Sequence, residues 1–260
     1  MAEPVFRLLE ISVTSAVRTL GPRITYHGLE KIPRVGGAVI AINHTSYIDW
    51  MPAAIAVYHR RRRLRFMIKR EMAQVKFVGF LMRGSSMIPV DRSAGAGAYA
   101  AAVQRLREGE LVGVYPEATI SRSFELKEFK TGAARMAREA QVPIIPMIAW
   151  GAHRMWTKDH PRKLLRNRVP ITLIVGEPLR ATDSVEQTNA ALREAMTELL
   201  QRAQFSYQHP AGAYWVPRRL GGSAPTLSEA KLLDEAELAE RARKKAEHAE
   251  KHAERAQREA

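Results

Sequence analysis

No cysteine occurs among the 260 residues of the sequence. This absence excludes a disulfide framework, a thiol nucleophile and a zinc site built on cysteine. Long apolar runs are also missing, and no segment reaches the roughly 20 apolar residues that a membrane-spanning helix needs. Charges at Glu3, Arg7 and Glu10 interrupt the N-terminal apolar residues, unlike in a signal peptide. We therefore expect a soluble or peripheral protein.

Two catalytic patterns are absent as well. No Gly-x-Ser-x-Gly elbow occurs, which argues against a serine hydrolase. His153 and His160 lie in a basic loop, but no acid or histidine stands at a convincing ligand spacing from them. We therefore expect no bound metal ion.

Positive charge exceeds negative charge, and the formal net charge is +14. The segment from Ala224 onward carries eight Lys/Arg and nine Asp/Glu, so the positive excess precedes it. Such a surface suits an anionic membrane, a phosphorylated substrate or nucleic acid. The run at 59–63, a histidine followed by four arginines, lacks the interleaved aromatic residues that single-strand nucleic-acid binding uses.

The most informative stretch is 38–49, which reads Ala-Val-Ile-Ala-Ile and then Asn-His-Thr-Ser-Tyr-Ile-Asp. Five apolar residues entered from a Gly-Gly turn predict a buried strand. His44 then follows the carboxyl end of that strand, where open α/β sheets bind ligands. Asp49 stands five residues later, so the two side chains are a candidate base and its orienting group.

Ser46 supports a second interpretation of the same residues. Its hydroxyl can cap a helix that begins at Tyr47, and Ser46-x-x-Asp49 resembles a capping box. In that interpretation His44 is a polar loop residue without a catalytic role. The stretch alone leaves both interpretations open, and they can also coexist, because a capped helix fixes the direction of Asp49.

Strands and helices alternate along the rest of the chain, which predicts an α/β fold. Strands are expected at 23–29, 64–68, 86–92, 111–119, 142–150 and 169–175. Helices are expected at 47–58, 71–82, 94–108 and 183–205, with another from 131. Several strands end in polar residues, which are Lys69, Arg92, Glu117 and Thr119.

The chain is expected to have four parts. Residues 1–22 form an amphipathic helix that packs on the core or lies in a membrane interface. Residues 23–206 form the α/β domain, and 207–223 form a linker or wrapping loop. Residues 224–260 form a charged helical tail, because they are rich in Ala, Glu, Lys and Arg.

Four blocks of sequence, taken together, resemble the glycerolipid acyltransferase family, whose founding example is lysophosphatidic acid acyltransferase. Residues 43–49 match the family's histidine-x4-aspartate box, and 88–92, 115–119 and 142–146 resemble its second, third and fourth blocks in order. The resemblance covers roughly 29–179. It implies an α/β fold with a mixed, mostly parallel central sheet flanked by helices, so 23–206 would be the acyltransferase domain.

The third block departs from the family pattern, which usually reads Pro-Glu-Gly-Thr-Arg. Ala118 replaces the glycine, Ile120 replaces the arginine, and the nearest arginine is Arg122. Ser86 stands where the second block often has glycine. These departures bear on which acceptor is used and how its phosphate is held.

The resemblance implies roles for individual residues. His44 would be the general base that removes a proton from the acceptor hydroxyl, with Asp49 holding the imidazole. Arg92, Glu117 and Thr119 would bind the glycerol phosphate of the acceptor. Further candidates for the same phosphate are Lys69, Lys130 and Arg122.

The implied reaction transfers a fatty acyl group to the sn-2 hydroxyl of 1-acylglycerol 3-phosphate, giving phosphatidic acid. The donor would be a thioester of coenzyme A or acyl carrier protein, and no other cofactor is implied. We expect a peripheral protein on the cytoplasmic face of the cell membrane, in contact with anionic lipid and not with nucleic acid.

Two alternatives stay open. The acceptor could be another lysophospholipid, glycerol 3-phosphate or a glycolipid, which Ile120 gives reason to consider. The chain could also be a non-catalytic protein that binds anionic membrane or nucleic acid, for which the arginines at 60–63 are the best support.

Overall fold

The computed structural model describes residues 8, 11, 12, 15, 17, 19, 21–69, 88–90, 95–164 and 168–258. The helix expected at 71–82 lies outside the described residues, and so does most of the one expected at 1–22. By its internal contacts the chain divides into two compact units. One comprises Met1–Ile120 and Leu126–Gln208, and the other comprises Ser121–Glu125 and His209–Ala260. The finer division into four parts stays a prediction.

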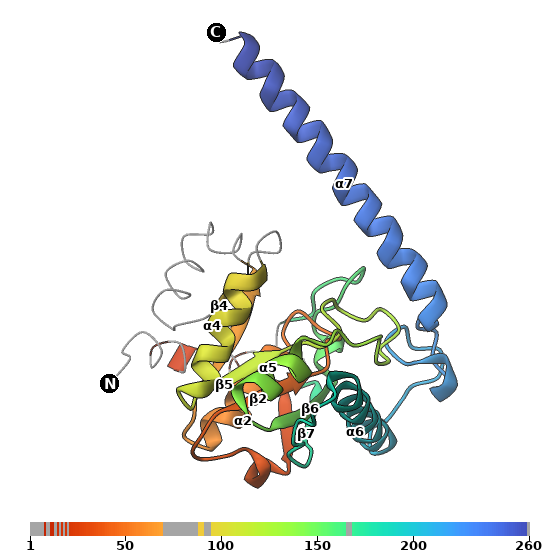
Figure 1. The fold of residues 1–260 in the computed structure, drawn as a ribbon. Helices are drawn as coiled ribbons and strands as arrows, with labels where there is room; N and C mark the ends of the chain where they lie inside the picture. Colours follow the sequence, from red (N-terminus) through yellow and green to blue (C-terminus); the bar gives the residue numbers. More distant parts are fainter. Residues whose placement is uncertain are drawn as a thin grey trace. The chain divides into compact units, whose positions relative to one another are not determined.

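A seven-stranded sheet forms the centre of the first unit, in the order β1-β7-β6-β2-β5-β3-β4 (Figure 1). The strands are β1 (Arg23–His27), β2 (Ala38–Ile42), β3 (Leu64–Lys69), β4 (Ile88–Val90), β5 (Leu111–Val114), β6 (Ile144–Trp150) and β7 (Pro170–Val175). Neighbouring strands are parallel except β6 and β7. The mixed, mostly parallel sheet confirms the expected fold class.

Strands β2 and β6 are buried along their whole length. A strand covered on both faces has no polar side, which explains why both sequences run without alternation. Gly113 in the neighbouring β5 has a packing reason of its own. A Cβ at this position would lie 3.0 Å from two ring atoms of Phe66, so the glycine leaves room for that ring.

Helices cover both faces of the sheet. The helix α2 (Trp50–His59) leads from β2 to β3, whereas α4 (Gly95–Arg107) and α5 (Gly132–Ala140) connect strands in the opposite direction across the sheet. Right-handed crossovers therefore place α2 on one face and α4 and α5 on the other. The helix α6 (Val185–Phe205) packs against α5 and β6 (Figure 1).

One apolar core lies between the sheet and α2. Alternate residues of a strand point to the same face, so Ala38, Ile40 and Ile42 of β2 share a side. They pack in one fully buried cluster with Ala53 and Val57 of α2. The packing fixes the end of β2 relative to α2, and it is the chain between these two elements that carries His44.

The second unit contains the helix α7 (Leu227–Arg258), which matches the predicted helical tail. It begins with a capping box, because the Glu229 N–H donates to Thr226 Oγ1 at 3.3 Å and the Thr226 N–H donates to the Glu229 carboxylate at 2.9 Å. Three short 3-10 helices complete the described elements, and they are η1 (Leu29–Lys31), η3 (Ala152–Arg154) and η4 (Arg218–Leu220).

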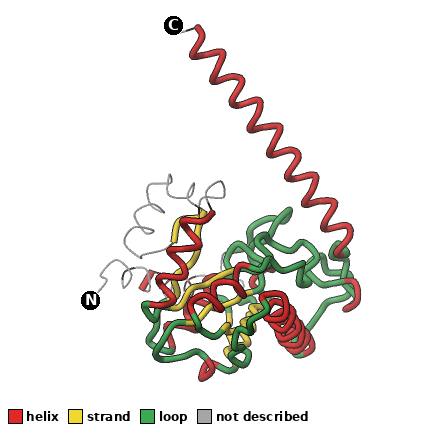
Figure 2. Tube along the Cα trace, viewed as in Figure 1, coloured by secondary structure: helices red, strands yellow, loops and turns green. Residues whose placement is uncertain are grey.

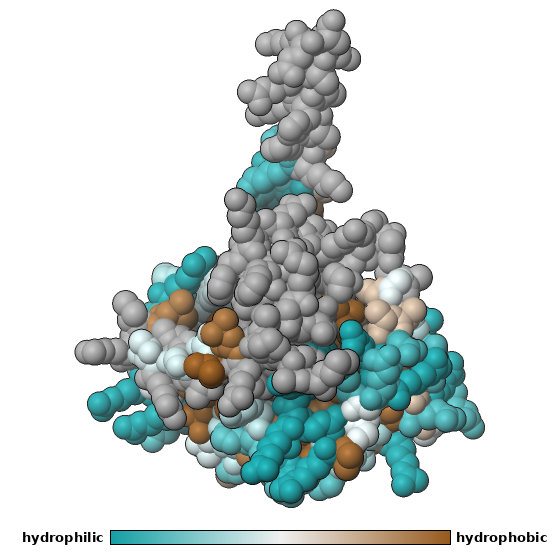
Figure 3. All heavy atoms as spheres, turned by 90° about the vertical axis from the view of Figure 1, so that its left-hand side faces the viewer, coloured by the Kyte–Doolittle hydropathy of each residue, from teal (hydrophilic) through white to brown (hydrophobic). Residues whose placement is uncertain are grey.

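None of the helices in the described part of the chain is long and apolar enough to cross a membrane. On the face drawn in Figure 3, hydrophilic side chains cover most of the coloured surface, and hydrophobic residues lie between them. This distribution fits a sequence in which 26% of the residues are charged.

Candidate active site

The carboxyl ends of β2 and β5 meet at one edge of the sheet, because these strands are parallel neighbours. His44 comes two residues after β2, and Glu117 comes three residues after β5. Strand β3 is parallel to β5 and ends at the same edge with Lys69, of which the backbone position alone is described. Arg92 lies outside the described residues. Loops carry the site, and they are drawn in green in Figure 2.

His44 and Asp49 are brought together as the base-and-orienter interpretation predicts. The His44 Nδ1 atom lies 3.3 Å from Asp49 Oδ2. The His44 side chain is 19% exposed, whereas the Asp49 side chain is fully buried. When Nδ1–H is directed at Asp49, the lone pair of Nε2 is available to accept a proton. The pair can therefore act as a general base at the accessible end of the imidazole.

The Asp49 carboxylate reaches back along the chain to hold the loop that carries His44. Its Oδ2 accepts the backbone N–H groups of Thr45 and Ser46, each at 2.7 Å. Burial raises the pKa of Asp49, while the bond from His44 and the two amides act in the opposite direction. Three donors converge on one oxygen, so the position of the carboxylate relative to the imidazole is fixed.

The prediction that Ser46 caps a helix starting at Tyr47 is wrong. Helix α2 begins at Trp50. The Ser46 hydroxyl donates to the Trp156 carbonyl at 2.6 Å and accepts the Ile48 N–H at 3.1 Å. The Ser46 hydroxyl thus bonds to a residue 110 positions further along the chain. Half of the capping box remains, because the Asp49 carboxylate accepts the Ser46 N–H.

Two side chains that sequence reasoning did not select also position His44. The Asn43 amide donates to the Ala149 carbonyl at 3.1 Å and accepts the Ala149 N–H at 2.7 Å. The Asn43 side chain thereby continues the hydrogen bonding between β2 and β6 beyond the last residue of β2. The Tyr115 ring stacks on the His44 imidazole with ring centroids 4.0 Å apart. Tyr115 is the first residue of the third block, but no spacing rule predicts the stack.

Glu117 bridges the loops that follow β2 and β5. Its Oε1 accepts the His44 N–H at 2.8 Å, and its Oε2 accepts the Lys127 N–H at 3.0 Å. Burial raises the pKa of Glu117 to about 7, against the two amide bonds that lower it, and nearby Asp49 raises it further. Both carboxylate oxygens are engaged by backbone amides. In this structure Glu117 therefore positions the base.

Thr119 lies close to a cation, although not to one of the predicted ones. The Lys127 ammonium donates to Thr119 Oγ1 at 2.6 Å. The side chain of Lys130 is exposed, and its backbone N–H donates to the Pro116 carbonyl at 2.8 Å. Lys127 is thus a further candidate for holding an anion beside Thr119. Its place in a basic loop was visible in the sequence, but its contact with Thr119 was not.

Arg122 belongs to the second unit and binds two carboxylates of α7. Its guanidinium donates to Asp234 and, at 2.8 Å, to Glu237. Ile120, which stands at the position of the family's arginine, is 4% exposed. A buried isoleucine offers no charge to a phosphate, and the neighbouring arginine is already paired with two acids. The role suggested for Arg122 in phosphate binding stays a prediction.

Ala118 adopts a left-handed backbone conformation with φ of 59°. This is the position where the family pattern has glycine, which reaches that conformation without the steric cost that a Cβ imposes. We expect Ala118→Gly to raise the free energy of unfolding by about 1 kcal/mol. Chemical denaturation of both proteins measures the difference.

Ala101→Gly is the matched control for this substitution. Ala101 is exposed within α4, where glycine costs about 1 kcal/mol relative to alanine. The two substitutions therefore have opposite expected signs. Destabilisation by both would show that the left-handed conformation at Ala118 carries no strain.

The parts of this site define a class of chemistry. A partly exposed histidine with a buried carboxylate partner can remove a proton from a hydroxyl, and that hydroxyl can then attack an acyl carbon directly. Among the described residues, no group of three or more His, Asp or Glu side chains is placed to hold a metal ion. The arrangement is that of a histidine-dependent transferase.

Comparison with known proteins names the family. The model of the Acyltransferase family matches residues 23–150. A 1-acyl-sn-glycerol-3-phosphate acyltransferase of Bacillus subtilis is 28% identical over 180 residues, which are 69% of this chain and 85% of that protein. One of Borreliella burgdorferi is 25% identical over 157 residues, which are 59% of this chain and 62% of that protein.

A solved structure shares the fold. The crystal structure of the 1-acyl-sn-glycerophosphate acyltransferase PlsC from Thermotoga maritima aligns with a TM-score of 0.61 and 19% identity, covering 76% of this chain and 81% of that one. The family model and the names of these relatives agree with the glycerolipid acyltransferase family that the four blocks indicated.

Proposed function

We propose that the protein transfers a fatty acyl group from a thioester to the sn-2 hydroxyl of 1-acylglycerol 3-phosphate, which forms phosphatidic acid. The observation that carries the proposal is the His44–Asp49 pair, with Nδ1 and Oδ2 3.3 Å apart at the edge of the sheet. The names of the curated relatives supply the acceptor.

In the proposed reaction, His44 Nε2 takes the proton of the acceptor hydroxyl while the oxygen attacks the thioester carbon. Asp49 stabilises the imidazolium that results. The tetrahedral intermediate then collapses, the carbon–sulfur bond breaks, and the imidazolium returns its proton to the departing thiolate. The acceptor is itself the nucleophile, so no acyl-enzyme forms.

Thr119, Lys127, Lys69, Lys130 and Arg92 are the candidates to hold the acceptor phosphate. Thr119 and Lys127 have the strongest geometric support, since their side chains contact each other and the Lys127 backbone is joined to Glu117. Arg92 and Lys69 are proposed from the motif and from strand position. A lysine ammonium and a hydroxyl both donate hydrogen bonds to phosphate oxygens.

The donor is proposed to be a thioester of coenzyme A or acyl carrier protein. The net charge of +14 supports peripheral attachment to the anionic cytoplasmic face of the cell membrane, where lipid substrates are present.

An acceptor and donor panel tests the proposal. We expect purified protein to acylate 1-acylglycerol 3-phosphate at sn-2 and to give a product with the mass of phosphatidic acid, whereas His44→Ala forms this product at least about 10²-fold more slowly. Mass spectrometry of the product and its position-specific hydrolysis measure both properties. Acylation of another hydroxyl alone would refute the proposed acceptor.

A second acceptor class has one structural observation in its favour. Ile120 is buried where the family has arginine, and Arg122 is paired with Asp234 and Glu237. A phosphate held with fewer arginines could belong to a different lysophospholipid or to glycerol 3-phosphate. These compounds are therefore included in the same panel, with a lysoglycolipid as the acceptor without phosphate.

A further inference from the structure

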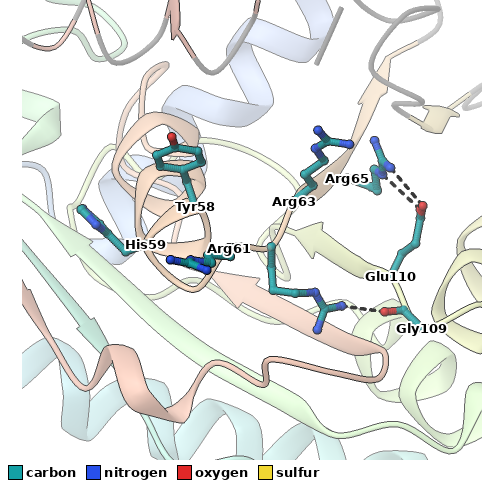
Figure 4. Close-up of a pocket in the computed structure, with 8 residues that line it drawn as sticks. Tyr58, His59, Arg61, Arg63, Arg65, Gly109 and Glu110 are labelled. Carbon is teal, nitrogen blue, oxygen red and sulfur yellow. Dashed lines mark hydrogen bonds and ion pairs between the residues drawn. The ribbon is translucent and has the colours of Figure 1, made fainter. Parts of the chain in front are cut away.

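A basic pocket lies at the opposite edge of the sheet from His44. It has a volume of about 680 Å³ and is lined by the end of α2, the start of β3 and the turn before β5 (Figure 4). Its charged residues are Arg61, Arg62, Arg63, Arg65 and Glu110. Ligand pockets in proteins commonly have volumes of about 300–1,000 Å³. The size is therefore sufficient for a small ligand or a lipid headgroup.

This pocket is separate from the candidate active site. Glu110 precedes the first residue of β5, whereas Tyr115 and Glu117 follow its last residue. A strand advances about 3.3 Å per residue, so the four residues of β5 separate the two sites by roughly 13 Å. A ligand in this pocket would occupy the amino-terminal edge of the parallel strands, away from the reacting atoms.

Most of the charged side chains that the structure describes around the pocket are arginines. Glu110, the carboxylate among the described lining residues, is held by Arg65 through two bonds, from Nε at 3.1 Å and from Nη2 at 3.0 Å (Figure 4). Arg105 of α4 also lies 3.7 Å from this carboxylate. Three further arginines, at 61–63, line the same pocket. Among the described lining residues, arginines therefore outnumber carboxylates.

Arg62 is fixed in place by neutral groups. Its guanidinium donates to the carbonyls of Pro33 at 3.0 Å, Gly36 at 2.9 Å and Gly109 at 2.6 Å. Carbonyl oxygens orient the cation without cancelling its charge. Partial burial lowers the pKa of Arg62, with Glu110 acting in the opposite direction. An anion in the pocket would offset this desolvation cost.

Arg61 has an uncommon backbone for a long side chain. Its φ is 57°, in the left-handed region that residues other than glycine seldom occupy. Within the described residues Arg61 has no ion pair, although it lines a pocket with three other arginines. This conformation ends α2 as in a Schellman cap, because the Arg61 N–H donates to the Tyr58 carbonyl at 2.8 Å and the Arg62 N–H donates to the Val57 carbonyl at 3.2 Å. The cap fixes the position of the Arg61 backbone at the pocket.

We propose that this pocket binds the phosphate group of an anionic ligand, as a second anion site distinct from the acyl-transfer site. Arginine guanidinium groups match phosphate geometry through paired N–H donors, which explains why this site uses arginine throughout. The phosphate can belong to a membrane phospholipid or to a free phosphorylated compound.

The test compares two double variants that remove the same charge. Arg61→Gln/Arg63→Gln removes two cations from the pocket and spares Arg62, whose bonds join three loops. Arg180→Gln/Arg202→Gln removes two exposed cations elsewhere on the same unit. Circular dichroism and thermal melting check that both variants fold. Acyl transfer with detergent-dispersed substrate is expected to be unchanged in both, because none of these residues lies at the active site.

Two binding measurements distinguish the sources of the phosphate. Calorimetry with inorganic pyrophosphate measures a free ligand, and flotation with phosphatidylcholine vesicles containing about one-fifth phosphatidylglycerol measures a headgroup. We expect the pocket variant to bind at least one probe about tenfold more weakly than wild type, and the control variant to differ by less than about twofold. A loss confined to pyrophosphate identifies a free ligand, and a loss confined to vesicles identifies a lipid.

Equal weakening in both double variants would overturn the proposal, because it would mean that only total charge matters. No binding of either probe by the wild-type protein would overturn it as well.

Discussion

His44→Ala is expected to lower kcat for acyl transfer by about 10²- to 10⁴-fold, the range that a positioned general base contributes. In the described part of the site, the His44 imidazole is the side chain that pairs with the buried carboxylate of Asp49. Without it, the acceptor hydroxyl must lose its proton to water. Initial rates at saturating donor and acceptor measure the effect.

The fold is expected to survive this substitution. His44 lies in a loop, and its side chain is partly exposed. Its backbone N–H donates to Glu117, and the substitution leaves this bond in place. His27→Ala, at the end of β1 on the far edge of the sheet, is the matched control and should keep wild-type rates. If His44→Ala retained more than about half of the wild-type rate, the non-catalytic interpretation of the chain would gain strength.

Asp49→Asn is expected to lower kcat by about 10² or more, although the shape of the side chain is preserved. The asparagine oxygen can still accept the amides of Thr45 and Ser46 at the position of Oδ2. It carries no charge, however, so the imidazolium that forms during the reaction loses its stabilising partner. The effect should fall on kcat with little change in KM, because Asp49 is fully buried and does not face substrate.

Stability should move in the opposite direction from activity. Burial raises the pKa of Asp49 above its ordinary value of 3.8, so the folded state binds its proton more tightly than the unfolded chain does. Ionised Asp49 therefore costs stability, and that cost grows as the pH rises above the unfolded value. Asn cannot ionise, so Asp49→Asn is expected to melt at or above the wild-type temperature at neutral pH, with a smaller gain near pH 4.

Asp49→Ala separates the two roles of this residue. It removes the acceptor of two buried backbone amides, each of which costs about 1–3 kcal/mol when left unpaired. This variant should therefore lose stability as well as activity. Wild-type activity in Asp49→Asn would show that Asp49 only shapes the loop.

The sequence predicted the central strands β2, β5 and β6 because they are buried and their apolar runs are uninterrupted. It also predicted the His44–Asp49 pair, since the two residues are five positions apart in one short loop that keeps their side chains close. Contacts between distant segments were not accessible to spacing rules. The start of α2 was placed too early because Ser46 bonds to Trp156, and no pattern within 38–49 contains that partner.

The same reason accounts for the missed residues. The Tyr115 stack, the Lys127–Thr119 bond and the pairing of Arg122 with α7 each join segments that the chain brings together only when it folds. Ala118 is different, because the departure from glycine was visible in the sequence and the structure shows its physical consequence, a left-handed alanine.

The side chain of Asn43 has a consequence for how such an enzyme changes over evolutionary time. Its amide takes the place of a peptide group beside β6, so the loop that carries the base is attached to a strand that is buried along its whole length. The loop at 118–131 is joined to Glu117 by a backbone bond from the Lys127 N–H, so its side chains can vary without breaking that link. A lineage can therefore alter that loop to admit a new acceptor while the proton-transfer geometry stays constant. Substrate range and chemistry are thereby inherited as separable traits.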